Sequence, residues 1–431
     1  MKEVKLGIIG LGTVGTGTVR LLERNADVIA RRAGGALKIA KIATLNSSKP
    51  RAVSVDPKIL TGDVNEILND PEIAIVAELI GGVKPAKEYV LRAIESGKSV
   101  VTANKELIAK YGADIQRAAD KAGVDFLFEG SVGGGIPIIK PLRESLSGNN
   151  MSELIGIVNG TTNYILTSMT REGRTFDEVL AEAQRLGFAE ADPSADVDAF
   201  DAVYKLAILA DVAFGVRVRV DDIYREGIRG VSARDIDYAT ELGYVIKLVA
   251  VARHTDEGAL ELRVHPALLP NAHPLASVSD SFNAVMATGD AVGEVMFYGR
   301  GAGSDPTGSA VVGDLIEAAR NIRSGRKCLV RHEPLQSTAI CKFDDIVTRF
   351  CVRMQVADQP GVLAQIAAVF GKHGISLESV LQKSSDDHNA EIFWMTHRCP
   401  QRAMNASLQD FVDMSTVNEV SSVLRVESDW I

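Results

Sequence analysis

A glycine pattern near the N-terminus constrains the fold of this chain more than any other feature. The segment Gly10-Leu11-Gly12-Thr13-Val14-Gly15 follows an apolar run, Val4 to Ile9, and precedes residues with helical spacing. A strand, a G-x-G-x-x-G turn and a helix together are typical of a dinucleotide-binding α/β unit, in which N–H groups at the helix start hold the pyrophosphate. The alternative is a glycine-rich turn in another α/β unit. The pattern favours these cofactor-binding residues: Gly10, Gly12, Thr13, Val14 and Gly15.

The end of the next strand indicates which nicotinamide cofactor the chain uses. The run from Leu37 to Thr44 is followed by polar residues that include Lys49 and Arg51 and no acid. NAD-binding domains commonly have an acid there for the ribose hydroxyls, whereas basic residues accommodate a 2′-phosphate. Lys49 and Arg51 therefore favour NADP.

A lysine follows another apolar strand. Ser99 to Thr102 is strand-like and leads into Ala103-Asn104-Lys105. Open parallel sheets bind their ligands at the carboxyl ends of the strands, so Lys105 lies where a ligand is expected. A loop lysine that is only solvated is the alternative.

The stretch from Leu186 to Ala210 combines an acidic turn with an apolar helix. From Ala202 to Ala210 the only charged residue is Lys205, and Asp201 lies four residues before it on the same helical face. A surface Asp–Lys pair is the ordinary interpretation, but so apolar a helix leaves little surface for one. A buried lysine beside a carboxylate has a tunable protonation state, so Lys205 is a candidate acid or base. The acids of the turn are Glu190, Asp192, Asp196 and Asp198.

Three consecutive glycines, Gly133 to Gly135, follow the strand-like run Val124 to Phe128 and Glu129. They allow the backbone to approach another group closely or to turn its carbonyls onto a cation. A flexible hinge between domains is the alternative, and the sequence does not separate the two.

The second half of the chain indicates two further folds. Strands, then helices, then strands beyond Asn150 predict an α+β domain, with one helix expected over Ile236 to Ala252. Gly299 to Thr307 precedes a helix that could close the nucleotide domain from the far end of the chain. Beyond a polar linker, the residues from Phe350 onward follow the order βαββαβ of a ferredoxin-like unit.

Composition excludes several classes of partner. The net charge of −9 argues against nucleic acid or an anionic membrane as the main partner. The four cysteines all lie in the last quarter without C-x-x-C spacing, which fits reduced thiols in a cytoplasm. No signal peptide and no run of membrane-spanning length is recognised. A cytoplasmic protein is therefore expected.

With these motifs in view, the chain resembles homoserine dehydrogenases along nearly its whole length. The tail, with Asp358-Gln359-Pro360-Gly361-Val362-Leu363, resembles an ACT domain, a small-ligand sensor attached to many biosynthetic enzymes. The chain departs from the family at Ala199, where a glycine is usual. The segments similar to the family are Gly10 to Gly15, Thr102 to Lys105, Asn159 to Tyr164, Gly187 to Pro193, and Asp201 to Leu209.

The resemblance implies reversible hydride transfer between a nicotinamide cofactor, NADP or NAD, and the pair aspartate semialdehyde and homoserine, in threonine, methionine and isoleucine biosynthesis. Lys205 would exchange the proton, a role that Lys105 could share, and Asp201 would orient Lys205. Glu190, Asp196 and Lys105 would contact the substrate. Thr102, Lys105, Gly187 and Gly303 would join the cofactor site. A monovalent cation such as Na⁺ would be bound by Glu129 and the carbonyls of Val132, Gly134 and Ile136.

The resemblance also implies the domains and partners. An α/β Rossmann-type nucleotide domain (1–130, completed by 305–325) precedes an α+β catalytic and dimerisation domain (131–304). A linker (326–348) leads to the ferredoxin-like ACT domain (349–431). Threonine is the expected effector, and a homodimer or homotetramer the expected assembly. A tail that only joins subunits is the alternative for this last domain.

Two other functions are weighed against this one. An enzyme that oxidises the semialdehyde through a cysteine thioester is excluded, because every cysteine lies at or beyond residue 328, outside the nucleotide and substrate motifs. A catalytically silent amino-acid sensor is disfavoured by the intact set of Glu190, Asp201, Lys205 and Lys105.

Overall fold

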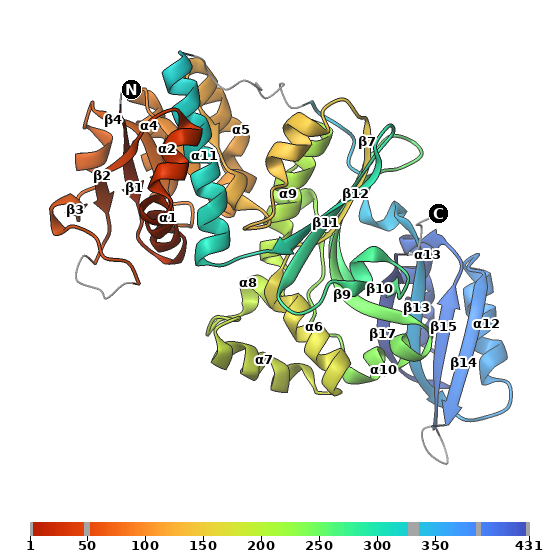
Figure 1. Cartoon of the computed structure of the whole chain (residues 1–431). Helices are drawn as coiled ribbons and strands as arrows, with labels where there is room; N and C mark the ends of the chain where they lie inside the picture. Colours follow the sequence, from red (N-terminus) through yellow and green to blue (C-terminus); the bar gives the residue numbers. More distant parts are fainter. Residues whose placement is uncertain (1–2, 47–51, 326–335, 385–388, 428–431) are drawn as a thin grey trace. The chain divides into compact units, whose positions relative to one another are not determined.

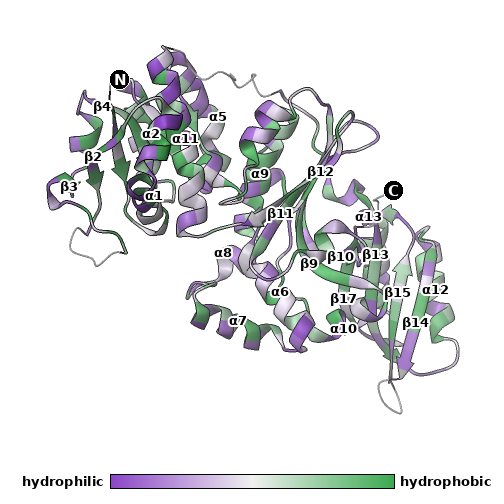
Figure 2. Cartoon of the chain, viewed as in Figure 1, coloured by the Kyte–Doolittle hydropathy of each residue, from purple (hydrophilic) through white to green (hydrophobic). Residues whose placement is uncertain are grey.

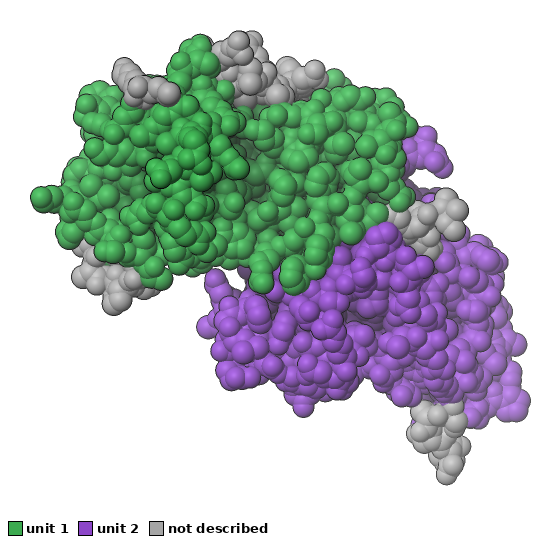
Figure 3. Space-filling model, viewed as in Figure 1, with its two compact units in different colours: residues 1–160, 202–223, 282–338 green, residues 161–201, 224–281, 339–431 purple. Residues whose placement is uncertain are grey.

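The computed structural model describes residues 3–46, 52–325, 336–384 and 389–427 (Figure 1). The chain forms two compact units, residues 1–160, 202–223 and 282–338 in one and residues 161–201, 224–281 and 339–431 in the other (Figure 3). Lys49, Arg51 and residues 326–335 of the expected linker lie outside the described residues. Within the described ranges, no helix is long and apolar enough to cross a membrane.

Unit 1 contains a six-stranded parallel sheet in the order β3-β2-β1-β4-β5-β6. This order confirms the expected dinucleotide-binding fold, in which the strand order reverses beside the first strand. The strands alternate with helices because apolar runs of strand length are separated by amphipathic segments (Figure 2). The strands are β1 (Val4–Ile9), β2 (Leu37–Ala43), β3 (Leu60–Thr61), β4 (Ile73–Glu78), β5 (Ser99–Thr102) and β6 (Phe126–Leu127).

A helix from far along the chain completes this sheet's core. Val311 and Leu315 of that helix, α11, are fully buried in one cluster with Leu6 and Ile8 of β1. A Cβ on Gly17 of α1 would lie 2.0 Å from the Ser304 carbonyl oxygen, so glycine is required where the two helices meet. The helices of this part are α1 (Thr13–Arg24), α2 (Ala26–Ala33), α3 (Asn65–Leu68), α4 (Ala86–Glu95), α5 (Lys105–Ala122) and α11 (Ser304–Ser324).

Unit 1 also holds three antiparallel strands in the order β12-β11-β7. They are β7 (Met151–Ile157), β11 (Phe282–Gly289) and β12 (Gly293–Arg300). Helix α9 (Phe200–Phe214) begins in unit 2 and continues into unit 1.

Unit 2 contains strands in the order β9-β10-β17-β13-β15-β14, with short β8 beside β10 and β16 beside β13. Its strands are β8 (Tyr224–Arg225), β9 (Tyr244–His254), β10 (Leu260–Pro270), β13 (Val347–Ala357), β14 (Leu377–Ser384), β15 (Asn389–Thr396), β16 (Cys399–Pro400) and β17 (Val417–Val426). Its helices are α6 (Gly160–Glu172), α7 (Phe176–Leu186), α8 (Ser194–Val197), α10 (Ala233–Glu241), α12 (Val362–Lys372) and α13 (Gln401–Val412).

The prediction of one helix is wrong. Instead of a helix over Ile236 to Ala252, the chain forms α10, a turn at Gly243 with φ of 80°, and strand β9. Residues from Val245 to Val251 include four β-branched side chains, which favour a strand over a helix. Their apolar character on both faces is explained by burial, since β9 is buried from Ile246 to Ala252.

The tail has the expected order, β13-α12-β14-β15-α13-β17, with the minor strand β16 added. Its sheet is not isolated, because β17 pairs in parallel with β10 at Ala267 and Leu268. The tail and the hairpin β9–β10 therefore share one continuous sheet within unit 2.

Candidate active site

The glycine turn after β1 has the geometry of a phosphate-binding loop. Gly10 has φ of +105°, and a Cβ on Gly15 would lie 2.2 Å from the Gly10 carbonyl oxygen, so both positions require glycine. A Cβ on Gly12 would meet nothing within 4 Å, which leaves the start of α1 open to a ligand. Helix α1 has no side-chain cap and no acid in its first turn. Its N-terminus therefore suits the pyrophosphate of a dinucleotide.

Two other cofactor candidates lie on elements of the same unit. Gly303 is the N-cap of α11, and the next residue, Ser304, donates from Oγ to the Thr13 carbonyl oxygen at 2.8 Å. Thr102 ends β5 fully buried and donates to Glu78 at 2.8 Å, while the Asn104 N–H donates to Thr102 Oγ1 at 3.0 Å. Gly303 thus lies close to the glycine turn. Thr102 instead fixes the backbone of Asn104, the N-cap of α5.

Lys105 is the first residue of α5. Asn104 caps that helix by accepting a hydrogen bond from the Leu107 N–H at 3.1 Å, and it donates to the Gly82 carbonyl at 2.6 Å. Burial raises the pKa of Glu78, which Thr102 and backbone N–H groups counteract. The sequence analysis gave no role to Asn104 or Glu78, although Asn104 stands within the motif that contains Lys105.

Lys205 and Asp201 are buried on α9, as the sequence predicted, with exposed fractions of 7% and 4%. The Lys205 ammonium donates to the Val158 carbonyl oxygen at 2.6 Å, just past the end of β7. This bond fixes the direction of a side chain that would otherwise be mobile. A buried cation held by a neutral carbonyl suits proton exchange with a bound oxygen.

The acidic turn divides into structural and accessible carboxylates. Asp198 pairs with Arg229 at 2.6 Å, and Asp192 accepts from the Ser194 N–H at 3.1 Å, so both stabilise the turn itself. Glu190 is exposed, and Asp196 lies on α8 and is partly exposed. These two remain the substrate-binding candidates.

Helix α6 contacts the residues that precede Glu190 in the sequence. Thr161 donates to the Phe188 carbonyl oxygen at 2.9 Å, and the Tyr164 ring packs on the Phe188 ring at 4.7 Å between centroids. Gly187, expected at the cofactor, is the C-cap of α7 in unit 2, with φ of 79°.

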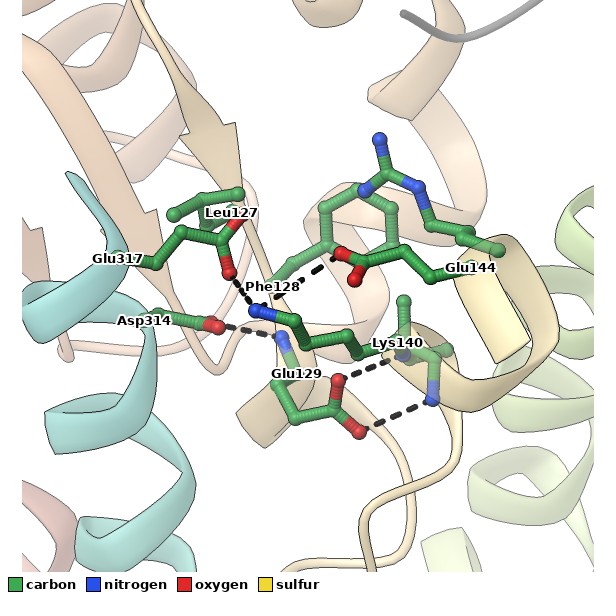
Figure 4. Close-up of a pocket in the computed structure, with 9 residues that line it drawn as sticks. Leu127, Phe128, Glu129, Lys140, Glu144, Asp314 and Glu317 are labelled. Carbon is green, nitrogen blue, oxygen red and sulfur yellow. Dashed lines mark hydrogen bonds and ion pairs between the residues drawn. The ribbon is translucent and has the colours of Figure 1, made fainter. Parts of the chain in front are cut away.

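The Glu129 carboxylate, expected at a cation, binds backbone N–H groups in this structure (Figure 4). Its oxygens accept from Ile138, Ile139 and Lys140 at 2.7, 3.0 and 2.8 Å. Burial raises the pKa of this carboxyl, and the three N–H groups oppose the rise. Since a carboxylate offers about four lone-pair positions, one remains for a cation.

The three glycines favour close backbone approach over a flexible hinge. A Cβ on Gly134 would lie 2.5 Å from the Gly301 carbonyl oxygen, and Gly133 and Gly134 have φ of +71° and +54°. The Gly135 N–H donates to the Arg300 carbonyl oxygen at 3.0 Å. Within the described ranges, no cluster of three or more His, Cys, Asp or Glu residues could hold a metal ion. A cation here would therefore depend mainly on carbonyl oxygens.

The tail contains a cavity of about 320 Å³ at the start of α12. Gly361 is the N-cap of this helix with φ of +92°, and the first turn has no side-chain cap and no acid. In the lining, Gln382 Nε2 donates to Asp358 Oδ1 at 3.4 Å. The cavity therefore offers N–H groups for a carboxylate and a carboxylate for an ammonium.

Three family models together match most of the chain. The NAD-binding domain of homoserine dehydrogenase matches residues 10–129, the homoserine dehydrogenase domain residues 137–316, and the ACT domain residues 352–403. A Synechocystis homoserine dehydrogenase is 48% identical over 99% of this chain and 100% of its own length. A crystal structure of a Thiobacillus denitrificans homoserine dehydrogenase has a TM-score of 0.95 and 43% identity over 99% of both chains. An archaeal homoserine dehydrogenase in complex with NADPH has a TM-score of 0.63 and 30% identity over 74% of this chain and 98% of its own.

Proposed function

This chain belongs to the homoserine dehydrogenase family and is an oxidoreductase that acts on a CH–OH group with a nicotinamide cofactor, and from that premise we propose which residues perform the reaction and how it is regulated. The observation that supports the proposal most is the buried Lys205, held at 2.6 Å by the Val158 carbonyl. The reaction is reversible hydride transfer between homoserine and aspartate semialdehyde.

The chain must supply a proton donor, a substrate site and a cofactor site. The nicotinamide, when bound, gives or accepts the hydride. Lys205 donates a proton to the carbonyl oxygen in reduction and accepts one from the hydroxyl in oxidation. Asp201, one turn earlier on α9, orients Lys205, and Lys105 shares the proton exchange or contacts the substrate. Glu190 and Asp196 bind the substrate ammonium by charge.

The cofactor proposal is NADP over NAD. It rests on Lys49 and Arg51 after β2 and on the absence of an acid at the end of that strand. The test is kcat/KM for each cofactor in the parent and in Lys49→Ala and Arg51→Ala. Each variant should lose preference for NADP while its kcat/KM for NAD is retained, and a parent that prefers NAD contradicts the proposal.

The cation proposal places Na⁺ at Glu129 and the carbonyls of Val132, Gly134 and Ile136. It is supported by the fourth lone-pair position of Glu129 and by the tight loop that the glycines allow. Sodium titration followed by thermal denaturation tests it. The parent should be stabilised by millimolar NaCl against an equal concentration of choline chloride, and Glu129→Gln should lose that difference.

Regulation by threonine is proposed for the tail. The open start of α12 would bind the amino-acid carboxylate, and Asp358 its ammonium. Asp358→Asn should abolish inhibition by threonine, while Asp413→Asn, an exposed acid just after α13, should keep it. If millimolar threonine and the other aspartate-family amino acids leave the parent unaffected, the tail only joins subunits.

The domain boundaries and the assembly are part of the same proposal. A nucleotide domain (1–130 with 305–325), a catalytic domain (131–304), a linker (326–348) and an ACT domain (349–431) are proposed. A homodimer or homotetramer is proposed because, among the described strands, β12 is paired only with β11 and β14 only with β15, so each has an edge to which a second copy could add. Light scattering coupled to size exclusion measures the mass of the assembly.

One assay tests the function directly. Purified protein with L-homoserine and NADP⁺ should produce absorbance at the wavelength of the reduced cofactor, and the reverse reaction should consume it. Protein that binds threonine but shows neither reaction is the silent sensor instead.

A further inference from the structure

Lys247 is a buried cation that the proposed mechanism does not use. It lies on β9 with an exposed fraction of 2%. Its ammonium donates to the Val278 carbonyl oxygen at 2.6 Å and to Asn163 Oδ1 at 3.1 Å. Asn163 Nδ2 in turn donates to the same Val278 oxygen at 3.2 Å. The three groups close a ring of hydrogen bonds between β9, helix α6 and the loop before β11.

Burying the Lys247 ammonium costs free energy, so a lysine at this position indicates a function beyond filling space. Burial lowers the pKa of Lys247 to about 8, with a further lowering from Arg171 and an opposing effect from Asp280. Arg171 lies at the end of α6 and pairs with Asp280 at 2.8 Å, so that carboxylate is already neutralised. An apolar side chain would fill the space without this desolvation penalty.

Helix α6 is the element that Lys247 fixes. Asn163 lies in its first turn, and the same turn contains Thr161 and Tyr164. Thr161 and Tyr164 both contact Phe188, through the 2.9 Å hydrogen bond and the ring packing at 4.7 Å. A displacement of the first turn of α6 therefore displaces Phe188 and the residues that follow it.

Those residues lead directly to Glu190. Gln184 of α7 donates from Nε2 to the Glu190 carbonyl oxygen at 3.1 Å. The backbone of Glu190 is therefore fixed, while its side chain is exposed. The segment from Gly187 to Glu190 thus contacts α6 through Phe188 and α7 through Glu190, and α6 is in turn hydrogen-bonded to β9 through Asn163 and Lys247.

We propose that Lys247 is a positioning residue for substrate binding, which sets the place of the segment from Gly187 to Glu190 by fixing the first turn of α6. The inference rests on the proposed role of Glu190. A positioning residue that acts before the chemical step changes the KM for homoserine more than kcat.

The experiment compares Lys247→Met with a matched buried lysine. Lys98, in unit 1, is 3% exposed and donates to the carbonyl oxygens of Asp70 and Ile73 at 2.5 and 2.9 Å, and burial lowers its pKa as well. Lys98→Met therefore removes the same kind of group from unit 1, whereas the contacts of Lys247 with Asn163 and Val278 lie in unit 2.

Lys247→Met should raise the KM for homoserine roughly tenfold, with kcat and the KM for cofactor within about twofold of the parent, because a small displacement of a binding group is enough for such a loss. Lys98→Met should leave the KM for homoserine unchanged even if its thermal midpoint falls equally. Lys247→Arg, which keeps charge and donors, should recover part of the loss. An unchanged KM in folded Lys247→Met overturns the inference, as does an equal rise in Lys98→Met.

Glu190→Gln separates this inference from the proposed function beneath it. If that variant raises the KM for homoserine and Lys247→Met does not, only the positioning role fails. If Glu190→Gln leaves the KM for homoserine unchanged, Glu190 does not bind the substrate. A raised KM in Lys247→Met would then show that Lys247 acts in another way than through Phe188 and Glu190.

Discussion

Replacing Lys205 with alanine removes the ammonium that donates to the Val158 carbonyl oxygen and that we propose exchanges the proton with the substrate. General acid–base groups contribute about a hundred- to ten-thousand-fold to rate. The variant should lose kcat in that range while binding NADPH as the parent does, since the glycine turn is untouched. Steady-state rates and cofactor fluorescence measure the two. A kcat within about threefold of the parent would contradict the assignment.

Asp211, near the end of α9, leads to a prediction of how the stability of the fold changes with pH. Burial raises the pKa of its carboxyl from 3.8 to about 7, although its oxygen accepts from the Val218 N–H at 2.7 Å. Between pH 4 and 7 the folded chain keeps a proton that the unfolded chain has released, so the stability contributed by this group falls as pH rises.

Asp211→Asn removes this titration and keeps an oxygen for Val218. The variant should therefore gain stability relative to the parent from pH 5 to pH 8. About two pKa units of this shift lie between pH 5 and the folded pKa of about 7, which corresponds to about 3 kcal/mol, and partial exposure reduces this to roughly 1–2 kcal/mol. Urea unfolding at both pH values measures the difference. An equal difference at the two pH values would show that Asp211 does not titrate between them.

Single residues differ in how far the sequence reveals them. The burial of Lys205 was predictable because its helix is apolar on every side. The left-handed conformation of Ala199, with φ of 65°, was not predicted, because a non-glycine residue rarely adopts it. The three N–H groups on Glu129 depend on a loop conformation that no pattern encodes.

At the scale of elements, local pattern predicted strands β1, β2, β5 and β6 of the parallel sheet and the helix that follows the glycine turn. It failed over Ile236 to Ala252, because a fully buried strand and a buried helix are both apolar all round. Lys247 was missed for the same reason, since on a helix it has no reason to meet Asn163. Only the pairing of β9 with β10 decides between the two structures, and that is a tertiary contact.

A buried ionic cluster joins β10 to the end of β17. Arg263 of β10 is fully buried and pairs with Glu427 and, at 2.5 Å, with Glu261, while Arg253 of β9 contacts the same two carboxylates. These arginines hold the pKa of Glu427 well below its usual range. Sequence analysis did not predict the cluster, because its members lie on strands that are far apart in the chain.

Glu427→Gln preserves the shape of this cluster and removes one of two negative charges. Breaking a buried pair by removing one partner costs about 3–5 kcal/mol. A loss of that size should appear in urea unfolding at pH 7. Glu72→Gln, which breaks the exposed pair with Lys5, is the control and should not change the unfolding midpoint. Equal midpoints for both variants would contradict a structural role for Glu427.

At the scale of the whole molecule, the order of folds was predictable, but the integration of the tail into unit 2 was not. The sequence presents the tail as a unit that could fold alone. In the structure, the tail's Arg353 pairs with Asp235 of α10 at 2.8 Å, and the tail's Glu391 pairs with Arg234 of α10 at 2.9 Å. Together with the pairing of β17 and β10, these bonds make the tail part of unit 2.

Deleting the tail is therefore expected to damage the rest of unit 2 rather than simply remove a sensor. A chain ending at Lys342 loses β17, which exposes the edge of β10, and it removes the Glu427 carboxylate from Arg253 and Arg263. It also leaves Asp235 without Arg353. We expect a thermal midpoint at least about 10 °C lower, since several kcal/mol are lost and each shifts the midpoint by roughly 2–4 °C. Asp358→Asn, by contrast, should keep the parent's midpoint while losing sensitivity to threonine. A truncated chain that keeps both midpoint and activity would show that the tail folds and acts independently.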